Sequence, residues 1–378
     1  MKQKKKKAIV YPYDIQFAPV VRYSHFIENY EIVGIAAPLS SGCCGKDAGR
    51  ADCGDDIGII VSEDFSEALE NCEAVIFAKT EREGSYTEDL YPKMKEVAGA
   101  GKDIIVAFNL NRDNYNQVKA LCDENKVTFG YFHNEEWFNM PFEPPYLSAH
   151  KLYTLETPVV FVLGEGEKCN KFETQLALRE YFTSQGYKVG QIGSRKYCEL
   201  MGFHSMPNFM FEARHEMEKI YLFNKLVKSI EVVEKPDVII IGVPGGVASM
   251  NAKNAGYCGI TAYEIANAVT PDAAVFCMYY AIWDHTYYDE MKNIAKYKLG
   301  LEVQNFVVSC SRVDWAGAAE TMNHMDFFTI SGRKVEAYKS EKQSEGLPVY
   351  NVVNMDDAKK LGERVEDILA GYAEIEFY

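Results

Sequence analysis

Val159-Val-Phe-Val-Leu-Gly-Glu-Gly-Glu-Lys-Cys-Asn-Lys171 is the stretch of sequence that decides the fold of this chain. Its first five residues are apolar or β-branched, which predicts a buried strand. After Lys171 the apolar residues recur at helical spacing, so we expect a helix that ends near Gly186. A strand, a glycine-containing turn and a helix in this order form a unit whose backbone N–H groups can bind phosphate.

The turn supplies the predicted ligand contacts Gly164, Gly166, Asn170 and Lys171. Lys171 would add a full positive charge to the partial charge of roughly +0.5 at the helix N-terminus. Asn170 can take the positive φ that this turn needs, because Asn tolerates it better than other residues except glycine. Glu165 and Glu167 place negative charge beside the same site. An ordinary strand–helix turn with a solvated Lys171 is the competing interpretation.

A second glycine turn follows another apolar run, Pro236–Gly246. P-loop proteins place their second phosphate or metal element at such a Gly-Gly turn after a buried strand, and this resemblance implies that Gly245 and Gly246 lie beside the same ligand.

The loop spacing resembles that of dethiobiotin synthetase and its relatives, whose phosphate loop reads Gly-Thr-Asp-x-x-x-Gly-Lys. Here Asn170 replaces the second glycine, and Phe172 replaces the Ser or Thr that would hold Mg²⁺. Gly242 stands where those relatives have an acidic residue at the end of the second strand. The resemblance implies a degenerate P-loop NTPase-like domain with ATP or CoA as candidate ligands, and we predict no metal site.

Length and charge narrow the classes of function. A chain of 378 residues is long enough for two domains, and its net charge of −15 disfavours binding to nucleic acid or to anionic membranes. No apolar run is long enough for a signal peptide or a membrane span, so we expect a cytoplasmic protein. The ten cysteines include no Cys-x-x-Cys, and we expect most of them to be reduced.

Residues 1–150 are predicted to form a first domain and residues 151–378 a second. Between residues 7 and 140, short apolar runs alternate with helical patterns, which is typical of a parallel sheet covered on both faces. The first domain is therefore Rossmann-like in topology. Its first strand is followed by Tyr11-Pro-Tyr-Asp-Ile15 and not by Gly-x-Gly-x-x-Gly, so no dinucleotide site is predicted.

A long loop, residues 40–56, follows the second predicted strand of this domain. It combines glycines and cysteines with both charge signs, which suits a polar ligand or a peptide. Metal binding and a plain surface loop remain alternatives. The residues predicted to contact the ligand or peptide are Cys43, Cys44, Gly45, Lys46, Asp47, Arg50 and Asp52.

Helical patterns also predict a helix over residues 17–30 and a long one over residues 208–233. Residues 327–330 are expected to add a strand to the second sheet, and residues 349–353 to close it.

Three segments together resemble the clostridial peptide maturation system family: Ala8-Ile-Val-Tyr-Pro-Tyr-Asp14, Gly45-Lys-Asp-Ala-Gly49 and the degenerate phosphate loop. Members accompany radical SAM maturases and small cysteine-rich precursor peptides, so the resemblance implies these as partners. The two-domain plan is also similar to a group that includes D-glutamate N-acetyltransferases.

Two classes of function follow. One is an accessory protein that holds a cysteine-rich precursor peptide and keeps a degenerate phosphate-binding loop. The other is an enzyme, either an ATP-dependent ligase or an acyl-CoA-dependent acyltransferase, for which the sequence offers no acid–base pair. His204, His215 and His285 are isolated from one another in sequence. Whether the protein is a homo-oligomer is left open.

Overall fold

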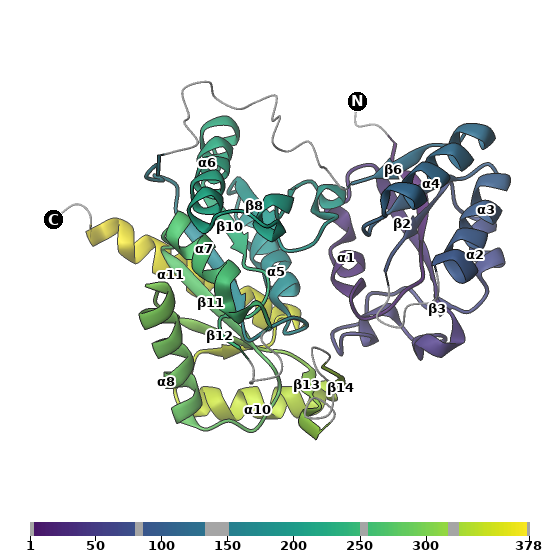
Figure 1. Ribbon diagram of the computed structural model, residues 1–378. Helices are drawn as coiled ribbons and strands as arrows, with labels where there is room; N and C mark the ends of the chain where they lie inside the picture. The colour runs from purple at the N-terminus through teal and green to yellow at the C-terminus, as the bar shows by residue number, and fades with distance from the viewer. Residues whose placement is uncertain (1–3, 80–85, 133–150, 250–255, 317–324, 376–378) are drawn as a thin grey trace. The chain divides into compact units, whose positions relative to one another are not determined.

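The structure is a computed structural model that describes residues 4–79, 86–132, 151–249, 256–316 and 325–375 (Figure 1). The chain divides into two compact units. The first is made of residues 1–134 with 195–205, and the second of residues 135–194 with 206–378. The predicted domain boundary at residue 150 lies outside the described residues.

Six parallel strands form the sheet of the first unit, in the order β3-β2-β1-β4-β5-β6. This is the strand order of a Rossmann fold, so the α/β prediction with a parallel sheet is confirmed here. The strands are β1 (Lys6–Tyr11), β2 (Tyr30–Ala36), β3 (Val61–Ser62), β4 (Ala74–Phe77), β5 (Asp103–Val106) and β6 (Phe129–Tyr131).

The helices of the first unit cover this sheet. β4 and β5 are buried along their whole length, as expected of strands with helices on both faces. Two helices begin with side-chain caps, because Asp64 accepts the N–H of Glu67 and Asn111 accepts that of Asn114. The helical elements are α1 (Ala18–Arg22), η1 (Ser24–Phe26), η2 (Leu39–Ser41), η3 (Ala48–Arg50), α2 (Phe65–Glu70), η4 (Tyr86–Leu90), α3 (Tyr91–Gly99) and α4 (Arg112–Asn125), and the segment 195–205 adds η6 (Cys198–Met201) and β9 (His204–Ser205).

The second unit is also built on a parallel sheet. Its strands run in the order β15-β12-β11-β7-β10-β8, and each of these neighbouring pairs is parallel. The second half of the fold prediction, a parallel α/β domain, is therefore confirmed. The strands are β7 (Val159–Gly164), β8 (Val189–Gly193), β10 (Val238–Gly242), β11 (Ala273–Met278), β12 (Asn305–Val308) and β15 (Val349–Tyr350).

Helix α5 begins directly after the β7 loop and packs against α11. Gly362 of α11 permits this contact, because a Cβ there would lie 2.2 Å from the ring of Tyr181 on α5. The remaining elements of the unit are α5 (Lys171–Ser184), η7 (Asn208–Phe211), α6 (Glu216–Glu234), η8 (Gly256–Gly259), α7 (Ile260–Ala268), α8 (His285–Ile294), η9 (Ala295–Leu299), β13 (Ser311–Val313), β14 (Phe327–Thr329), α10 (Gly332–Ser344) and α11 (Met355–Ile375).

Three predicted elements were wrong in extent or place. The helix expected over residues 17–30 ends at Arg22, because Tyr23 leaves helical geometry and Ile27 is extended. The aromatic and β-branched residues of this stretch are weak helix formers. The helix over 208–233 is interrupted at His215, whose backbone is extended. The strand at 327–330 pairs antiparallel with β13 and not with the main sheet. Helices α7, α8 and α10 were not predicted.

No described helix is long and apolar enough to cross a membrane.

Candidate functional site

The loop between β7 and α5 lies at the carboxyl edge of the second sheet. β7 stands between β10 and β11, so its last residue, Gly164, has a neighbouring strand on either side. A Cβ on Gly164 would lie 2.4 Å from the carbonyl oxygen of Cys277, the last residue but one of β11. Ligands of open parallel sheets bind at this edge.

Backbone N–H groups without acceptors gather in this loop. Among the residues that the structure describes, the amides of Cys169, Asn170 and Lys171 donate no hydrogen bond to the protein. Asn170 is the N-cap of α5 with φ +63°, so the positive φ predicted from its sequence position is confirmed. Its side chain is 6% exposed, and its buried Nδ2 has no partner among the described residues. The loop therefore offers unused donors at a helix N-terminus, which is the environment that an anion requires.

Lys171 is the cation of the site, and it is buried. Its side chain is 4% exposed, and its ammonium group donates to the carbonyl oxygen of Gly245. The same ammonium group lies 3.8 Å from Oε1 of Glu167, and that oxygen accepts the N–H of Gly245 at 2.8 Å. The interpretation of Lys171 as a solvated surface residue was thus wrong. The structure also brings Gly245 to the phosphate loop, where the sequence placed it.

Two glycines are required because the chain segments approach closely. A Cβ on Gly246 would lie 2.2 Å from the carbonyl oxygen of Glu165. A Cβ on Gly242 would lie 2.2 Å from the side chain of Gln175, which occupies that space. Gly242 therefore makes room for α5.

Glu165 and Tyr279 are further members of the site. The carboxyl group of Glu165 accepts the backbone N–H of Tyr279, and the hydroxyl group of Tyr279 donates to the carbonyl oxygen of Glu167. Burial raises the pKa of Glu165 to about 8, although the N–H of Tyr279 works to lower it. The sequence analysis missed Tyr279 and Gln175. Tyr279 follows β11 directly, so its place at the carboxyl edge was a usable signal.

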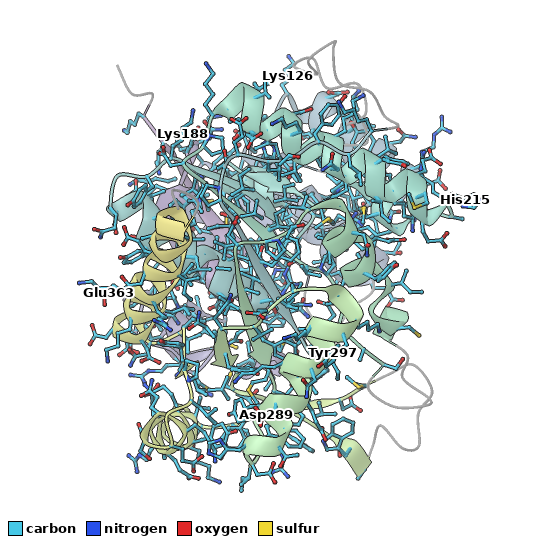
Figure 2. All side chains as sticks on the ribbon, turned by 90° about the vertical axis from the view of Figure 1, so that its left-hand side faces the viewer. Lys126, Lys188, His215, Asp289, Tyr297 and Glu363 are labelled. Carbon is cyan, nitrogen blue, oxygen red and sulfur yellow. The ribbon has the colours of Figure 1, made fainter. Side chains whose placement is uncertain are left out.

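Phe172 is 2% exposed and belongs to the core. No group of three or more His, Cys, Asp or Glu residues in the described part of the chain could hold a metal ion. His215 points into solvent with a side chain 90% exposed (Figure 2). His285 is paired with Glu345 at 3.2 Å.

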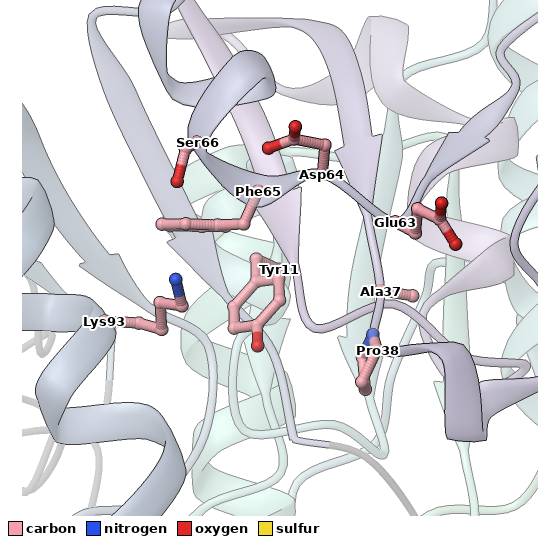
Figure 3. Close-up of a pocket in the computed structure, with 8 residues that line it drawn as sticks. All are labelled: Tyr11, Ala37, Pro38, Glu63, Asp64, Phe65, Ser66 and Lys93. Atoms are coloured by element: carbon pink, nitrogen blue, oxygen red, sulfur yellow. The ribbon is translucent and has the colours of Figure 1, made fainter.

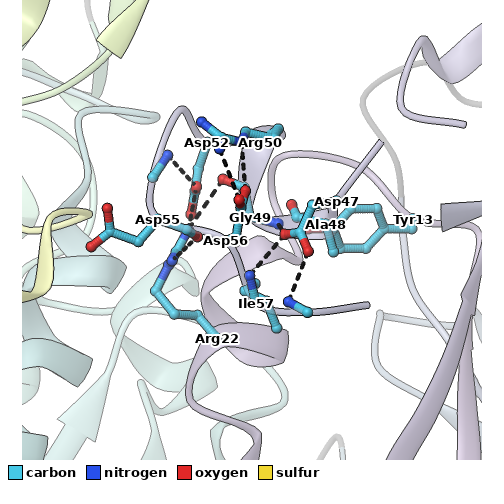
Figure 4. Close-up of polar contacts among 12 residues, drawn as sticks. Tyr13, Arg22, Asp47, Ala48, Gly49, Arg50, Asp52, Asp55, Asp56 and Ile57 are labelled. Atoms are coloured by element: carbon cyan, nitrogen blue, oxygen red, sulfur yellow. Dashed lines mark hydrogen bonds and ion pairs between the residues drawn. The ribbon is translucent and has the colours of Figure 1, made fainter. Parts of the chain in front are cut away.

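The loop predicted to bind a ligand or peptide, residues 40–56, lies at the carboxyl edge of the first sheet, between β2 and β3. Asp47 holds it together (Figure 4). Its carboxylate accepts the N–H groups of Gly49, Ile57 and Gly58 at 2.7–2.8 Å. Burial works to raise the pKa of Asp47, but these N–H groups outweigh it and lower the pKa. Asp47 thus stabilises the loop itself.

Asp52 has a similar internal role. It pairs with Arg22 of α1 at 2.6 Å, and both side chains are buried (Figure 4). Burial raises the pKa of Asp52 even though Arg22 works to lower it. Arg22 also donates to the carbonyl oxygens of Asp55 and Gly49. The pair therefore ties the loop to α1.

The remaining predicted residues of this loop lie nearer the surface. Lys46 is exposed and donates to the carbonyl oxygen of Gly42, and Gly45 is exposed with φ +75°. Arg50 pairs with Asp56 on the surface. Cys43 and Cys44 are half-buried thiols, and burial raises the pKa of Cys43.

A cavity of about 400 Å³ opens in the first unit where β1, β2 and β3 end (Figure 3). The rings of Tyr11 and Phe65 lie 4.5 Å apart at their centres, and the ammonium group of Lys93 lies 4.6 Å from the centre of the Phe65 ring. The sequence analysis assigned no site residue here. The lining residues are Tyr11, Ala37, Pro38, Glu63, Asp64, Phe65, Ser66 and Lys93.

No protein-family profile and no curated protein sequence matches the chain. Among solved structures, a DUF1611 family protein from Anabaena variabilis is similar over 96% of this chain and 100% of its own, with a TM-score of 0.62 and 13% identity. This likeness shows a shared two-unit fold. A nucleotide-binding protein from Archaeoglobus fulgidus, in complex with ADP, matches 54% of this chain and 86% of its own, with a TM-score of 0.29 and 12% identity. Amine dehydrogenase from Mycobacterium smegmatis matches 42% of this chain and 47% of its own, with a TM-score of 0.27 and 18% identity.

Proposed function

We propose that the second unit binds the phosphate group of a nucleotide or coenzyme at the loop that joins β7 to α5. One observation supports this above the others: the amides of Cys169, Asn170 and Lys171 have no acceptor among the described residues. Leaving backbone N–H groups without partners costs free energy, which a phosphate oxygen would recover by accepting them. The buried ammonium group of Lys171 adds the charge that favours an anion over a neutral ligand.

We propose a ligand that binds without Mg²⁺. In dethiobiotin synthetase-like loops two positions hold the Mg²⁺ ion, and here neither of them can. Phe172 is buried in the core, and the space at Gly242 is filled by Gln175. The diphosphate of CoA meets this condition, and ATP is the alternative. If the protein is an enzyme, the site therefore favours an acyl-CoA-dependent transfer over Mg-ATP hydrolysis.

A ligand-dependent stability measurement tests the proposal. At about 100 times its dissociation constant, a bound ligand stabilises a fold by about 2.7 kcal/mol, which corresponds to a melting shift of roughly 5–10 °C. We expect this shift with CoA, and with ATP to no greater extent, in magnesium-free buffer. Lys171→Ala should abolish it. Lys188→Ala is the matched control, because Lys188 lies on the surface of the same unit (Figure 2).

Absence of any shift with CoA and ATP would refute the proposal. A shift with ATP that strictly requires Mg²⁺ would show that another carboxylate serves the metal.

We propose in addition that the protein acts as an accessory in the maturation of a ribosomally made cysteine-rich peptide. The support is the resemblance of three segments to the clostridial peptide maturation system family, and the proposed partners are the precursor peptide and a radical SAM maturase. The exposed part of the 40–56 loop is the proposed peptide contact, because Asp47 and Asp52 serve the loop itself.

Binding of the precursor peptide tests this second proposal. Lys46→Ala should weaken the binding of a labelled precursor peptide, since Lys46 is exposed in the loop. Lys119→Ala, an exposed change on α4, should leave it unaltered. If the full-length protein does not bind the peptide, or if both variants bind as well as the unchanged protein, the loop is not the contact.

A further inference from the structure

The phosphate site already holds an anion from its own chain. The carboxylate of Glu167 accepts the N–H of Gly245 at 2.8 Å, and its oxygen lies 3.8 Å from the ammonium group of Lys171. The N–H of Gly245 and the ammonium group of Lys171 are two of the groups that a bound phosphate would use. A carboxylate oxygen and a phosphate oxygen accept the same N–H groups, so the two compete for them.

The carboxylate of Glu167 is open to solvent. The Glu167 side chain is 61% exposed, whereas the Lys171 side chain is 4% exposed. The backbone of Glu167 is held separately, because its carbonyl oxygen accepts the hydroxyl group of Tyr279. The carboxylate can therefore swing into solvent while the loop keeps its path.

The contact is not an ordinary ion pair along a helix. Glu167 precedes α5, which begins at Lys171, so the two residues are not on one helical face. The pair forms only because the loop turns back toward the second glycine turn, and Asn170 makes that turn with φ +63°. This geometry brings the carboxylate to the N–H of Gly245 and close to the ammonium group of Lys171.

We propose that Glu167 is an internal competitor for the phosphate site and sets its affinity and selectivity. This inference rests on the proposed phosphate binding. In the free protein, Glu167 neutralises Lys171. A ligand must displace the carboxylate, and a bound phosphate then has a negative charge nearby. The site therefore favours phosphate esters and diphosphates that present few negative charges over triphosphates, whose extra charge adds to the repulsion.

The test is the affinity for ADP and for ATP, measured by isothermal titration calorimetry in magnesium-free buffer with the full chain. Glu167→Gln keeps an oxygen that can accept the N–H of Gly245 but removes the charge. We expect it to bind both nucleotides more tightly, by about tenfold for ADP and by more for ATP. Glu173→Gln is the control: it removes one charge from the first turn of α5 and should change affinity by less than about threefold.

The outcomes separate the two claims. Equal affinity of Glu167→Gln and the unchanged protein overturns the internal competitor and leaves phosphate binding standing. A gain in nucleotide affinity that is confined to Glu167→Gln supports the internal competitor. The same holds if Glu167→Gln alone binds measurably. An equal gain in Glu173→Gln overturns it, because the effect would then be general charge. If neither variant nor the unchanged protein binds ADP or ATP, the internal competitor is overturned, and the test with CoA alone decides the proposed phosphate binding.

Discussion

Glu165→Gln should change how the stability of the protein depends on pH. The Glu165 carboxyl group accepts the N–H of Tyr279 within the protein, and burial raises its pKa from the ordinary 4.5 to about 8. The glutamine oxygen can accept the same N–H, so the variant keeps the contact and loses the titration. Its effect on stability at low pH should therefore be small.

The magnitude follows from the difference between the folded and unfolded states. Below pH 4.5 the group is protonated in both states and contributes nothing to the pH dependence. Between pH 4.5 and about 8 the unfolded chain releases the proton while the folded protein keeps it, so stability falls as pH rises. A shift of this size is worth at most about 5 kcal/mol. Because part of the Glu165 side chain reaches the surface, water screens the effect and we expect about 1–3 kcal/mol.

Urea denaturation at pH 5 and at pH 8.5 measures this directly. The measured quantity is the free energy of unfolding of Glu165→Gln minus that of the unchanged protein. This difference should be about 1–3 kcal/mol larger at pH 8.5 than at pH 5. Glu290→Gln, which changes an exposed carboxylate on α8 of the same unit, is the control for a general change of charge. If the pH dependence of Glu165→Gln equals that of the unchanged protein, the carboxyl group is not protonated in the fold and the reasoning is wrong.

Three further predictions concern stability. Gly246→Ala should lower the free energy of unfolding, measured in urea, by about 1–3 kcal/mol, because its Cβ would lie 2.2 Å from the carbonyl oxygen of Glu165. If the variant is as stable as the unchanged protein, the turn at Gly246 and the loop after β7 can move apart. Arg22→Ala should cost about 3–5 kcal/mol because Asp52 would stay buried without its partner, whereas Arg50→Ala should change little; equal effects would contradict the buried pair. Asp47→Ala should speed amide hydrogen exchange at residues 49, 57 and 58, and unchanged protection there would mean that other acceptors hold the loop.

The parallel sheets were predictable because their strands are continuous apolar runs. Val159–Leu163 is buried throughout, and this pattern is typical of a strand that has helices on both faces. The positive φ of Asn170 was predictable for a local reason, since few residues adopt it. The place of Gly245 beside the loop between β7 and α5 was predicted from the resemblance to P-loop proteins, and it agrees with β7 and β10 ending at one edge of the sheet.

Other contacts depend on the direction in which a side chain points, and a sequence pattern does not predict that direction. Glu167 reaches Gly245 across 78 positions of the chain, and Gln175 fills the space left by Gly242. The pairing of Arg22 with Asp52 spans 30 positions and shows that a charged loop residue serves the fold. Such residues look the same in sequence whether they bind a ligand or each other. Helix boundaries failed where aromatic residues interrupt the helix after Arg22.

The most direct test of the account is whether the second unit requires a phosphate group in its ligand. CoA and pantetheine share the same thiol-bearing arm, but only CoA carries phosphates and adenosine; adenosine, which has no phosphate, is therefore titrated as a second control and should not bind. Titration of the full chain with each, in magnesium-free buffer, should show binding of CoA and none of pantetheine at the same concentrations, and Lys171→Ala should remove the difference. Equal binding of CoA and pantetheine, or CoA binding that survives Lys171→Ala unchanged, would contradict the assignment of the loop between β7 and α5 as a phosphate site.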